Sequence, residues 1–164
     1  MATILAIDPG TARIGMVLWS TEQRRVIETW RPEEVDTDVL FDVLKRALSG
    51  GWVVLVEKVQ AQRLADQDTI DTADQAGWIL GVCDAWGIPC HRMYRREVKK
   101  ALDCAGGTDA VVAKRCAEIL VGKSDFRAAK GTKSKPGPAY NVLADAQQAL
   151  GLCLAWLELN GGEQ

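Results

Sequence analysis

Three acidic residues far apart in the sequence, Asp8, Glu57 and Asp145, occupy positions where a charged side chain requires an explanation. Asp8 and Glu57 directly follow the apolar runs 3–7 and 52–56, each of which predicts a buried strand. A carboxylate at such a point is costly unless it faces solvent or a cation. Asp145 lies in an apolar stretch that predicts a helix, among small residues that permit close approach to a sheet. We therefore interpret Asp8, Glu57 and Asp145 as metal ligands and as catalytic residues.

The chemistry available to such a cluster is that of phosphate esters. If the two strands are neighbours, their backbones lie about 4.8 Å apart, and the carboxylates can share one cation or hold a pair about 3.5–4 Å apart. Oxygen ligands without histidine or cysteine favour Mg²⁺, for which Mn²⁺ can substitute, over zinc. One ion lowers the pKa of the attacking water and the other stabilises the leaving oxygen. The sequence thus predicts two Mg²⁺ ions and hydrolysis of a phosphodiester.

Each acid also has an interpretation without function. Asp8-Pro9-Gly10 is ordinary turn chemistry, Glu57 is compatible with a surface acid on an edge strand, and Asp145 with a surface acid on a helix. The placement of all three at or within apolar elements favours the ligand role.

The composition predicts one globular domain covering residues 1–164. The chain has 48% apolar and 26% charged residues, and no apolar run approaches the roughly 20 residues that cross a bilayer. No secretion signal begins the chain, so we expect a cytoplasmic protein of a bacterial or phage-infected cell that does not bind a membrane. Five cysteines without a CxxC pair and a single histidine, His91, argue against zinc and against histidine-based catalysis.

Positive charge is concentrated in one third of the chain. Residues 1–90 hold 8 Lys/Arg and 14 Asp/Glu, residues 91–135 hold 12 and 5, and residues 136–164 hold none and 3. This distribution favours a surface that follows nucleic-acid phosphates, although a solvated charge run is the commoner fate. The interval 122–138 has no periodicity and predicts a basic, flexible loop. The candidate DNA-binding residues are Arg92, Arg95, Arg96, Lys100, Lys114, Lys123, Arg127, Lys130, Lys133 and Lys135.

Apolar periodicity predicts the elements that position the acids. Strands are expected at 3–7, 14–19, 26–30, 52–56 and 88–93, and helices at 39–48, 66–86, from 95, at 109–120 and at 140–159. The hydroxyl of Thr108 is expected to cap the helix that begins at Asp109. The order β-β-β-α-β-α-β-α is typical of the ribonuclease H-like fold, an α/β class with a five-stranded mixed sheet flanked by helices.

Four segments in this order resemble the RuvC-like Holliday junction resolvases, especially those of phages and prophages. The segments are Ile4 to Gly15, Val54 to Val59, Arg96 to Lys100 with the glycine turn that follows, and Lys130 to Tyr140 before Asp145-Ala146. The resemblance spans nearly the whole chain. It implies a homodimer that binds four-way or branched DNA and makes paired nicks with Mg²⁺, leaving 5′-phosphate and 3′-hydroxyl ends. Lys99 matches a catalytic lysine expected near the scissile phosphate.

The chain departs from this family pattern at three positions. Val142 stands where the family has a further acid three residues before the last aspartate, so the fourth ligand is not identified. Gln60 replaces the aromatic wedge that opens the junction. Val111 replaces a lysine early in the helix after the glycine turn, where the nearest cation is Lys114.

Three other functions compete with a junction nuclease. A YqgF-like ribonuclease shares the Asp-x-Gly-Thr type of start, although Pro9 and the loop 130–138 favour the DNA-junction branch. An actin-like ATPase requires two lobes to enclose nucleotide, and this chain has room for one. A catalytically impaired junction-binding protein is suggested by Val142.

Overall fold

The chain forms one five-stranded mixed sheet. Its strands are β1 (Thr3–Asp8), β2 (Gly15–Ser20), β3 (Arg25–Trp30), β4 (Val53–Lys58) and β5 (Cys90–Tyr94), in the order β3-β2-β1-β4-β5. Strand β2 pairs antiparallel with β1 and β3, whereas β4 pairs parallel with β1 and β5. The computed structural model describes residues 2–10, 14–30, 36–58 and 66–161, and of Asp145 only the backbone. The predicted five-stranded mixed sheet is therefore confirmed.

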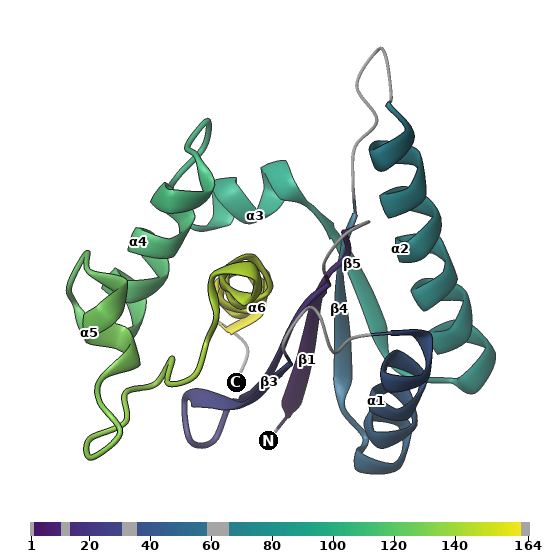
Figure 1. The fold of residues 1–164 in the computed structure, drawn as a ribbon, viewed down its shortest axis with the longest axis horizontal. Coiled ribbons are helices and arrows are strands. Elements are labelled where there is room, and N and C mark those ends of the chain that lie inside the picture. The colour runs from purple at the N-terminus through teal and green to yellow at the C-terminus, as the bar shows by residue number, and fades with distance from the viewer. Residues whose placement is uncertain (1, 11–13, 31–35, 59–65, 162–164) are drawn as a thin grey trace.

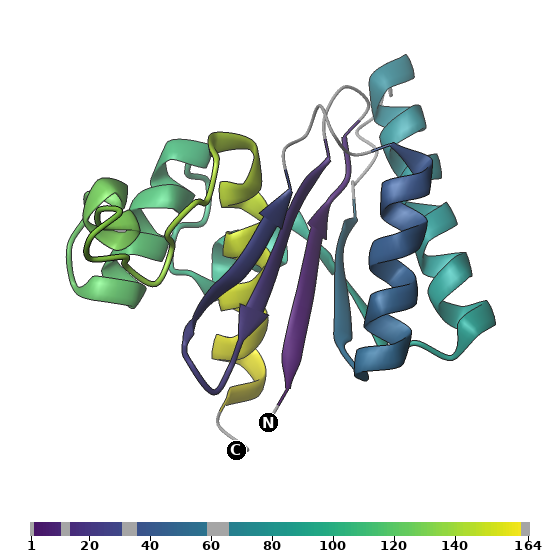
Figure 2. The same cartoon turned by 60° about the horizontal axis from the view of Figure 1, so that its bottom comes forward.

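Helices cover both faces of the sheet (Figure 1). Helices α1 (Thr37–Gly50) and α2 (Gln67–Trp86) lie on one face and α6 (Gln147–Asn160) on the other, as Figure 2 also shows. Helices α3 (Arg95–Ala101) and α4 (Asp109–Val121) pack against α6, and α5 (Phe126–Lys130) packs against α4. Because α6 lies between the sheet and α4, its residues 149–155 are all buried. No helix among the described residues is both long and apolar enough to cross a membrane.

Alternation along β1 divides the core into two parts. Leu5 and Ile7 pack on the side of α1 and α2, whereas Ile4 and Ala6 pack on the side of α6. Asp8 follows Ala6 by two residues, so the last position of β1 belongs to the α6 side of the sheet.

Caps fix the ends of the two helices on the first face. The side chain of Asp66 accepts a hydrogen bond from the backbone N–H of Thr69 at 2.8 Å and starts α2, and Asp36 starts α1 in the same way. Gly51 and Gly87, with φ of 62° and 68°, end the two helices in the left-handed conformation.

The start of the last helix differs from the expectation. Helix α6 begins at Gln147 instead of residue 140, and Asp145 lies in the 3₁₀ helix η2 (Ala144–Ala146) that precedes it. Asn141 explains the late start, because its φ of 66° is left-handed and cannot belong to a right-handed helix. The expected hydroxyl cap is also wrong, since Thr108 occupies the N-cap position of α4 without a side-chain capping bond.

The interval 122–138 contains more regular structure than its sequence indicates. Helix α5 lies within it, followed by a turn that an antiparallel bridge between Gly131 and Pro136 closes. The N–H groups of Gly137 and Ala139 donate to the carbonyl oxygens of Lys130 and Ala129, both at 2.9 Å. A five-residue helix is too short to produce a helical period, so the sequence pattern predicted only a loop. We call residues 130–136 the basic hairpin.

Candidate active site

The carboxyl ends of β1 and β4 place two of the predicted ligands side by side. Ile7 pairs with Val56 in the parallel ladder, so Asp8 and Glu57 are the next residues along two adjacent strands. Glu57 follows Leu55, which packs on the α6 side of the sheet, and Asp8 belongs to the same side. Strand register therefore brings together two acids that lie 49 positions apart.

The carboxyl group of Glu57 is buried and that of Asp8 is half-buried. The Glu57 residue is only 4% exposed, and burial raises the pKa of its carboxyl even though the nearby charge of Arg95 lowers it. Burial and then the negative charge of Glu57 raise the pKa of Asp8 to about 7. Two adjacent carboxyls whose ionised forms are disfavoured, one buried and one half-buried, are an arrangement that a bound cation stabilises.

Arg95 supplies a positive charge at this point of the structure. Its Nη1 donates to Oε1 of Glu57 at 2.7 Å, and its Nη2 contacts the carboxylate of Asp109 and donates to Oε1 of Gln148 at 3.1 Å. Burial alone would lower the pKa of Arg95, but Glu57 and Asp109 raise it above its ordinary value. A contact between Arg95 and DNA, as the sequence predicts, would therefore compete with three internal contacts.

Asp109 and Gln148 join the cluster although the sequence pattern did not single them out as site residues. Asp109 is the first residue of α4, and Gln148 lies in the first turn of α6 and donates to the carbonyl oxygen of Asp109 at 3.4 Å. The available signals were weak: Asp109 is one of five acids in the cationic segment, and Gln148 lies three residues after Asp145. We call Asp8, Glu57, Arg95, Asp109 and Gln148 the carboxylate site.

Lys99 lies beside the carboxylate site. Its Nζ donates to the carbonyl oxygen of Gly107 at 2.6 Å and lies 4.0 Å from the carboxylate of Asp109. The side chain is 19% exposed, so the ammonium group belongs to the rim of the carboxylate site. Its action on a phosphate stays a prediction.

Asp145, the third predicted ligand, is located by its backbone alone. It lies in η2, one turn before Gln148, and its side chain is outside what the structure describes. Val142, where the family pattern has a further acid, is fully buried in the core on the α6 side. The side chain that reaches the carboxylate site is instead that of Gln148, on the other side of Asp145. Gln60, at the position of the family's wedge, lies outside the described residues.

Several of the predicted DNA-binding residues are exposed on elements near the carboxylate site. Arg92 is on β5 and Lys100 on α3, and the guanidinium of Arg96 lies 5.5 Å from the ring centroid of Tyr94. Lys114 is exposed on α4, the helix on which Val111 is 39% exposed. These cations lie on elements adjoining the carboxylate site.

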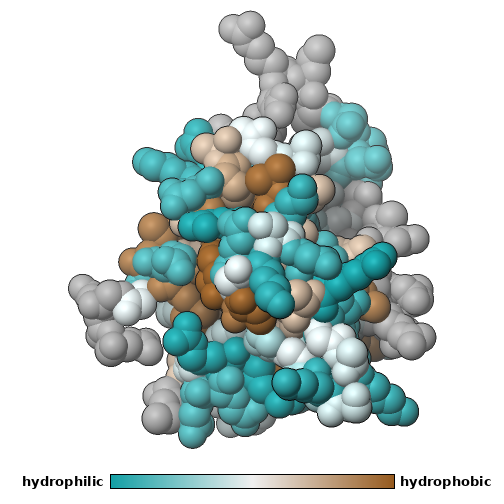
Figure 3. Space-filling view, turned by 90° about the vertical axis from the view of Figure 1, so that its left-hand side faces the viewer, coloured by the Kyte–Doolittle hydropathy of each residue, from teal (hydrophilic) through white to brown (hydrophobic). Residues whose placement is uncertain are grey.

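The remaining predicted cations lie on and beside the basic hairpin. The N–H of Val26 donates to Pro138 O at 2.8 Å and Thr29 Oγ1 donates to Asn141 O at 3.0 Å, so segment 138–141 follows β3 along its length. Since β3 runs in the same direction as β1, the hairpin joins the fold at the end of the sheet away from Asp8. Figure 3 shows the side of α4 and α5, where hydrophilic residues cover much of the lower part. In the described part of the chain, no acidic group forms an ion pair with Lys123, Arg127, Lys130, Lys133 or Lys135.

The donor chemistry of Asp8 and Glu57 fits a hard divalent cation. Both offer carboxylate oxygens, with no cysteine or histidine beside them in the ladder. Among the residues whose side chains are described, no group of three acidic, histidine or cysteine residues is arranged to hold a metal. Asp145, the third predicted ligand, is not among the residues whose side chains are described, so its part in a metal site stays a prediction.

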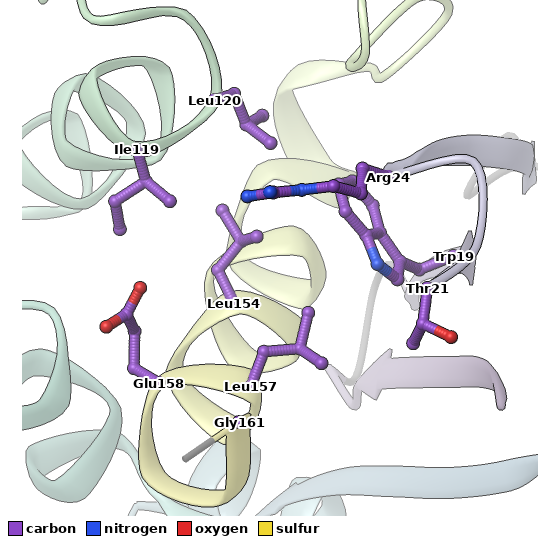
Figure 4. Close-up of a pocket in the computed structure, with 9 residues that line it drawn as sticks. All are labelled: Trp19, Thr21, Arg24, Ile119, Leu120, Leu154, Leu157, Glu158 and Gly161. Atoms are coloured by element: carbon purple, nitrogen blue, oxygen red, sulfur yellow. The ribbon is translucent and has the colours of Figure 1, made fainter. Parts of the chain in front are cut away.

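A cavity of about 670 Å³ lies at the other end of α6 (Figure 4). Trp19 and Arg24 line it from the β2–β3 hairpin, Ile119 from α4 and Leu157 from α6. None of the predicted catalytic or DNA-binding residues lines this cavity, so it is separate from the carboxylate site.

Comparison with solved structures identifies the fold. RuvC of Thermus thermophilus, in complex with Holliday junction substrate, matches with a TM-score of 0.59 and 19% identity, over 99% of this chain and 97% of that one. The chain has the RuvC fold. A second T. thermophilus RuvC structure matches with a TM-score of 0.55 and 22% identity, over 97% and 96% of the two chains. No protein-family model and no curated protein matches the sequence.

The RuvC fold confirms the ribonuclease H-like class and the RuvC-like resemblance predicted from the sequence. At 19 and 22% identity the likeness establishes the fold. Within this RuvC fold, Asp8 is the last residue of β1 and Glu57 the last but one of the parallel strand β4, and Asp145 lies in η2, which directly precedes the helix that covers them.

Proposed function

We propose that the chain is a nuclease that depends on divalent metal and cuts branched DNA, in particular four-way junctions. The observation that carries this proposal is the pair of adjacent carboxyls, half-buried Asp8 and buried Glu57, near the carboxyl ends of the central strands. The RuvC of T. thermophilus, whose fold the chain has, is described in complex with a Holliday junction substrate. That likeness supports branched DNA as the substrate class.

In this proposal Asp8, Glu57 and Asp145 hold two Mg²⁺ ions, for which Mn²⁺ can substitute. A metal ion bound there would stabilise negative charge on the phosphate and activate the attacking water. Lys99 lies close enough to the carboxylate site to hold a phosphate oxygen. Each carboxylate site hydrolyses one phosphodiester and leaves 5′-phosphate and 3′-hydroxyl ends.

Paired cuts require two active sites, and we propose a symmetric homodimer that supplies them. Helix α2 supports this assembly because it leaves two large apolar side chains in solvent, Ile70 at 44% and Trp78 at 37% exposure. The ring of Trp78 is held edge-to-face against Phe41, with centroids 5.0 Å apart. A second copy of the chain would cover this surface.

A junction-binding protein without nuclease activity is the second candidate. Gln148 favours it, because this neutral amide reaches the cluster where a further carboxylate would strengthen cation binding. Arg95 favours it as well, since its guanidinium already neutralises Glu57.

The deciding experiment compares labelled four-way junction, linear duplex and structured RNA of matched sequence, each with Mg²⁺ or Mn²⁺. We expect paired nicks in the junction, little cutting of the duplex, and no cutting by Asp8→Asn. Tight junction binding without nicks in either metal would support the binding protein instead. Cleavage of RNA alone would assign the chain to the YqgF-like type of activity.

A further inference from the structure

We propose that Arg95 is a built-in counter-ion that competes with the divalent cation for Glu57. In the metal-free protein its guanidinium holds Glu57, and metal binding displaces it from Glu57 while Asp109 and Gln148 retain it. Arg95 is thus a positioning residue that sets how tightly the carboxylate site takes up metal. This inference rests on the metal site of the proposed function.

The fold places Arg95 in contact with Glu57. Arg95 is the first residue of α3, directly after β5, and Met93 of β5 pairs with Glu57 in the ladder. The arginine is therefore held beside the end of β4 by the backbone. Its Nη1 lies 2.7 Å from Oε1 of a carboxylate whose side chain is 6% exposed. Because Glu57 has so little contact with water, a cation that approaches that oxygen meets the guanidinium charge at close range, and we infer that this repulsion displaces Nη1.

Two other side chains hold the second guanidinium nitrogen of Arg95. Nη2 contacts Asp109 and Gln148, which come from the first turns of α4 and α6. These two residues are joined to each other through the 3.4 Å contact between Gln148 Nε2 and Asp109 O. Asp109 is 64% exposed on its side chain, so it can follow the guanidinium outward without a large desolvation cost.

The forked shape of the guanidinium makes this exchange possible. Five N–H donors in a plane allow Nη1 to release one carboxylate while Nη2 keeps another, which a single ammonium group does not reproduce. Displacement also avoids leaving the arginine unpaired in a partly buried place, because Asp109 remains as its partner.

The test measures Mn²⁺ binding by calorimetry on the full chain, without DNA. Arg95→Gln should tighten Mn²⁺ binding by about tenfold or more, because a unit charge this close to the ligand carries at least that weight at an effective dielectric constant near 20. Arg46→Gln is the matched control, since Arg46 forms an Arg–Glu pair with Glu28 on the α1 side, away from the site. The control should leave Mn²⁺ affinity unchanged.

The variant Asp109→Asn distinguishes displacement of Arg95 from a simple effect of the charge of Asp109 on Mn²⁺. If Asp109 retains the displaced arginine, Asp109→Asn should weaken Mn²⁺ binding in the wild-type chain and have little effect in Arg95→Gln. If Asp109 acted only through its own negative charge, Asp109→Asn would weaken Mn²⁺ binding equally in the wild type and in Arg95→Gln. Equal effects would overturn the exchange.

Metal-free stability provides a readout that does not depend on activity. Arg95→Gln should lower the melting temperature in EDTA, because Glu57 loses its partner, and Mn²⁺ should raise the melting temperature more than in the wild type. If Arg95→Gln does not fold, Arg95→Lys takes its place. It retains the charge but lacks the fork, so its ammonium group cannot release Glu57 while it keeps Asp109, and Mn²⁺ binding should be weaker than in the wild type.

Failure of this inference can be told from failure of the proposed function. If the wild type binds Mn²⁺, Glu57→Gln abolishes the binding, and Arg95→Gln does not tighten it or Arg95→Lys in its place does not weaken it, the counter-ion role is wrong and the metal site stands. If neither the wild type nor any variant binds Mn²⁺, the proposed metal-dependent function is wrong together with the inference.

Discussion

The two cationic regions of the molecule use their positive charge differently. At the carboxylate site, Arg95 and Lys99 lie among acids and carbonyl oxygens, within 4.0 Å of Asp109 or Glu57. On the basic hairpin, Lys133 and Lys135 are exposed and have no acidic partner in the described part of the chain. Both regions belong to the same net-positive third of the sequence. The density of Lys and Arg along the sequence therefore does not show whether a given cation neutralises the protein's own acids or remains available to phosphates.

The difference follows from packing. Arg95 and Lys99 are carried by the short helix after β5, which the parallel ladder places beside Glu57. The basic hairpin joins the fold beside the start of β3, at the other end of the sheet. Backbone hydrogen bonds hold it there, and its residues 131–136 are exposed. We therefore expect the carboxylate site to serve catalysis and the basic hairpin to serve DNA binding, as in the proposed function.

The largest effect is expected at Asp8. Asp8→Asn should lower junction cleavage by roughly a thousandfold, because a metal site contributes several kcal/mol to the transition state and each tenfold in rate corresponds to about 1.4 kcal/mol. Junction affinity should stay nearly unchanged, since the hairpin cations are intact. Single-turnover cleavage and a gel-shift titration measure the two quantities. Loss of binding instead would mean that Asp8 has a structural role.

The second effect is the dependence of stability on pH in the metal-free protein. The pKa of Asp8 rises from 3.8 to about 7 on folding, because of burial and the charge of Glu57. Between pH 3.8 and about 7 the folded state binds more protons than the unfolded chain. The free energy of unfolding therefore falls as the pH rises through this range. With about 1.4 kcal/mol for each unit, the loss amounts to several kcal/mol.

Urea unfolding in EDTA at about pH 5 and about pH 8 measures this loss. The wild type should be less stable at the higher pH, and Asp8→Asn should show a flatter dependence because the amide does not titrate. Saturating Mn²⁺ should restore stability at the higher pH in the wild type only. An identical pH slope in both chains would show that Asp8 titrates normally.

The same contrast explains what the sequence could predict. Asp8 and Glu57 were predictable because each ends an apolar run, and the parallel ladder then puts equivalent strand ends together. Asp109 and Gln148 were not, because they reach the site only when α4 packs on α6, and helix packing leaves no local pattern around either residue. Arg95 was recognised as a cation but not as the partner of Glu57.

The third effect concerns the hairpin. Lys130→Ala, Lys133→Ala and Lys135→Ala together should weaken junction binding and flatten its salt dependence, by up to about 0.9 in the log–log slope for each phosphate that is no longer neutralised. Cleavage of bound junction should change little, since the carboxylate site is untouched. Lys45→Ala is the control, because Lys45 is exposed on α1, on the opposite face of the sheet. An unchanged salt slope would remove the hairpin from the DNA-binding surface.

The smallest effect separates the shape of the hairpin from its charge. Gly131 has a φ of 68°, and a Cβ there would lie 2.4 Å from the carbonyl oxygen of Lys135, so Gly131→Ala strains the backbone and prevents the bridge to Pro136 from closing. The lysines remain, but their spacing is no longer fixed, and junction affinity should fall less than in the triple variant. Faster hydrogen exchange at the amides of Gly137 and Ala139 would confirm that the hairpin has opened. Unchanged affinity with an opened hairpin would mean that the hairpin contributes charge alone, as a flexible loop would.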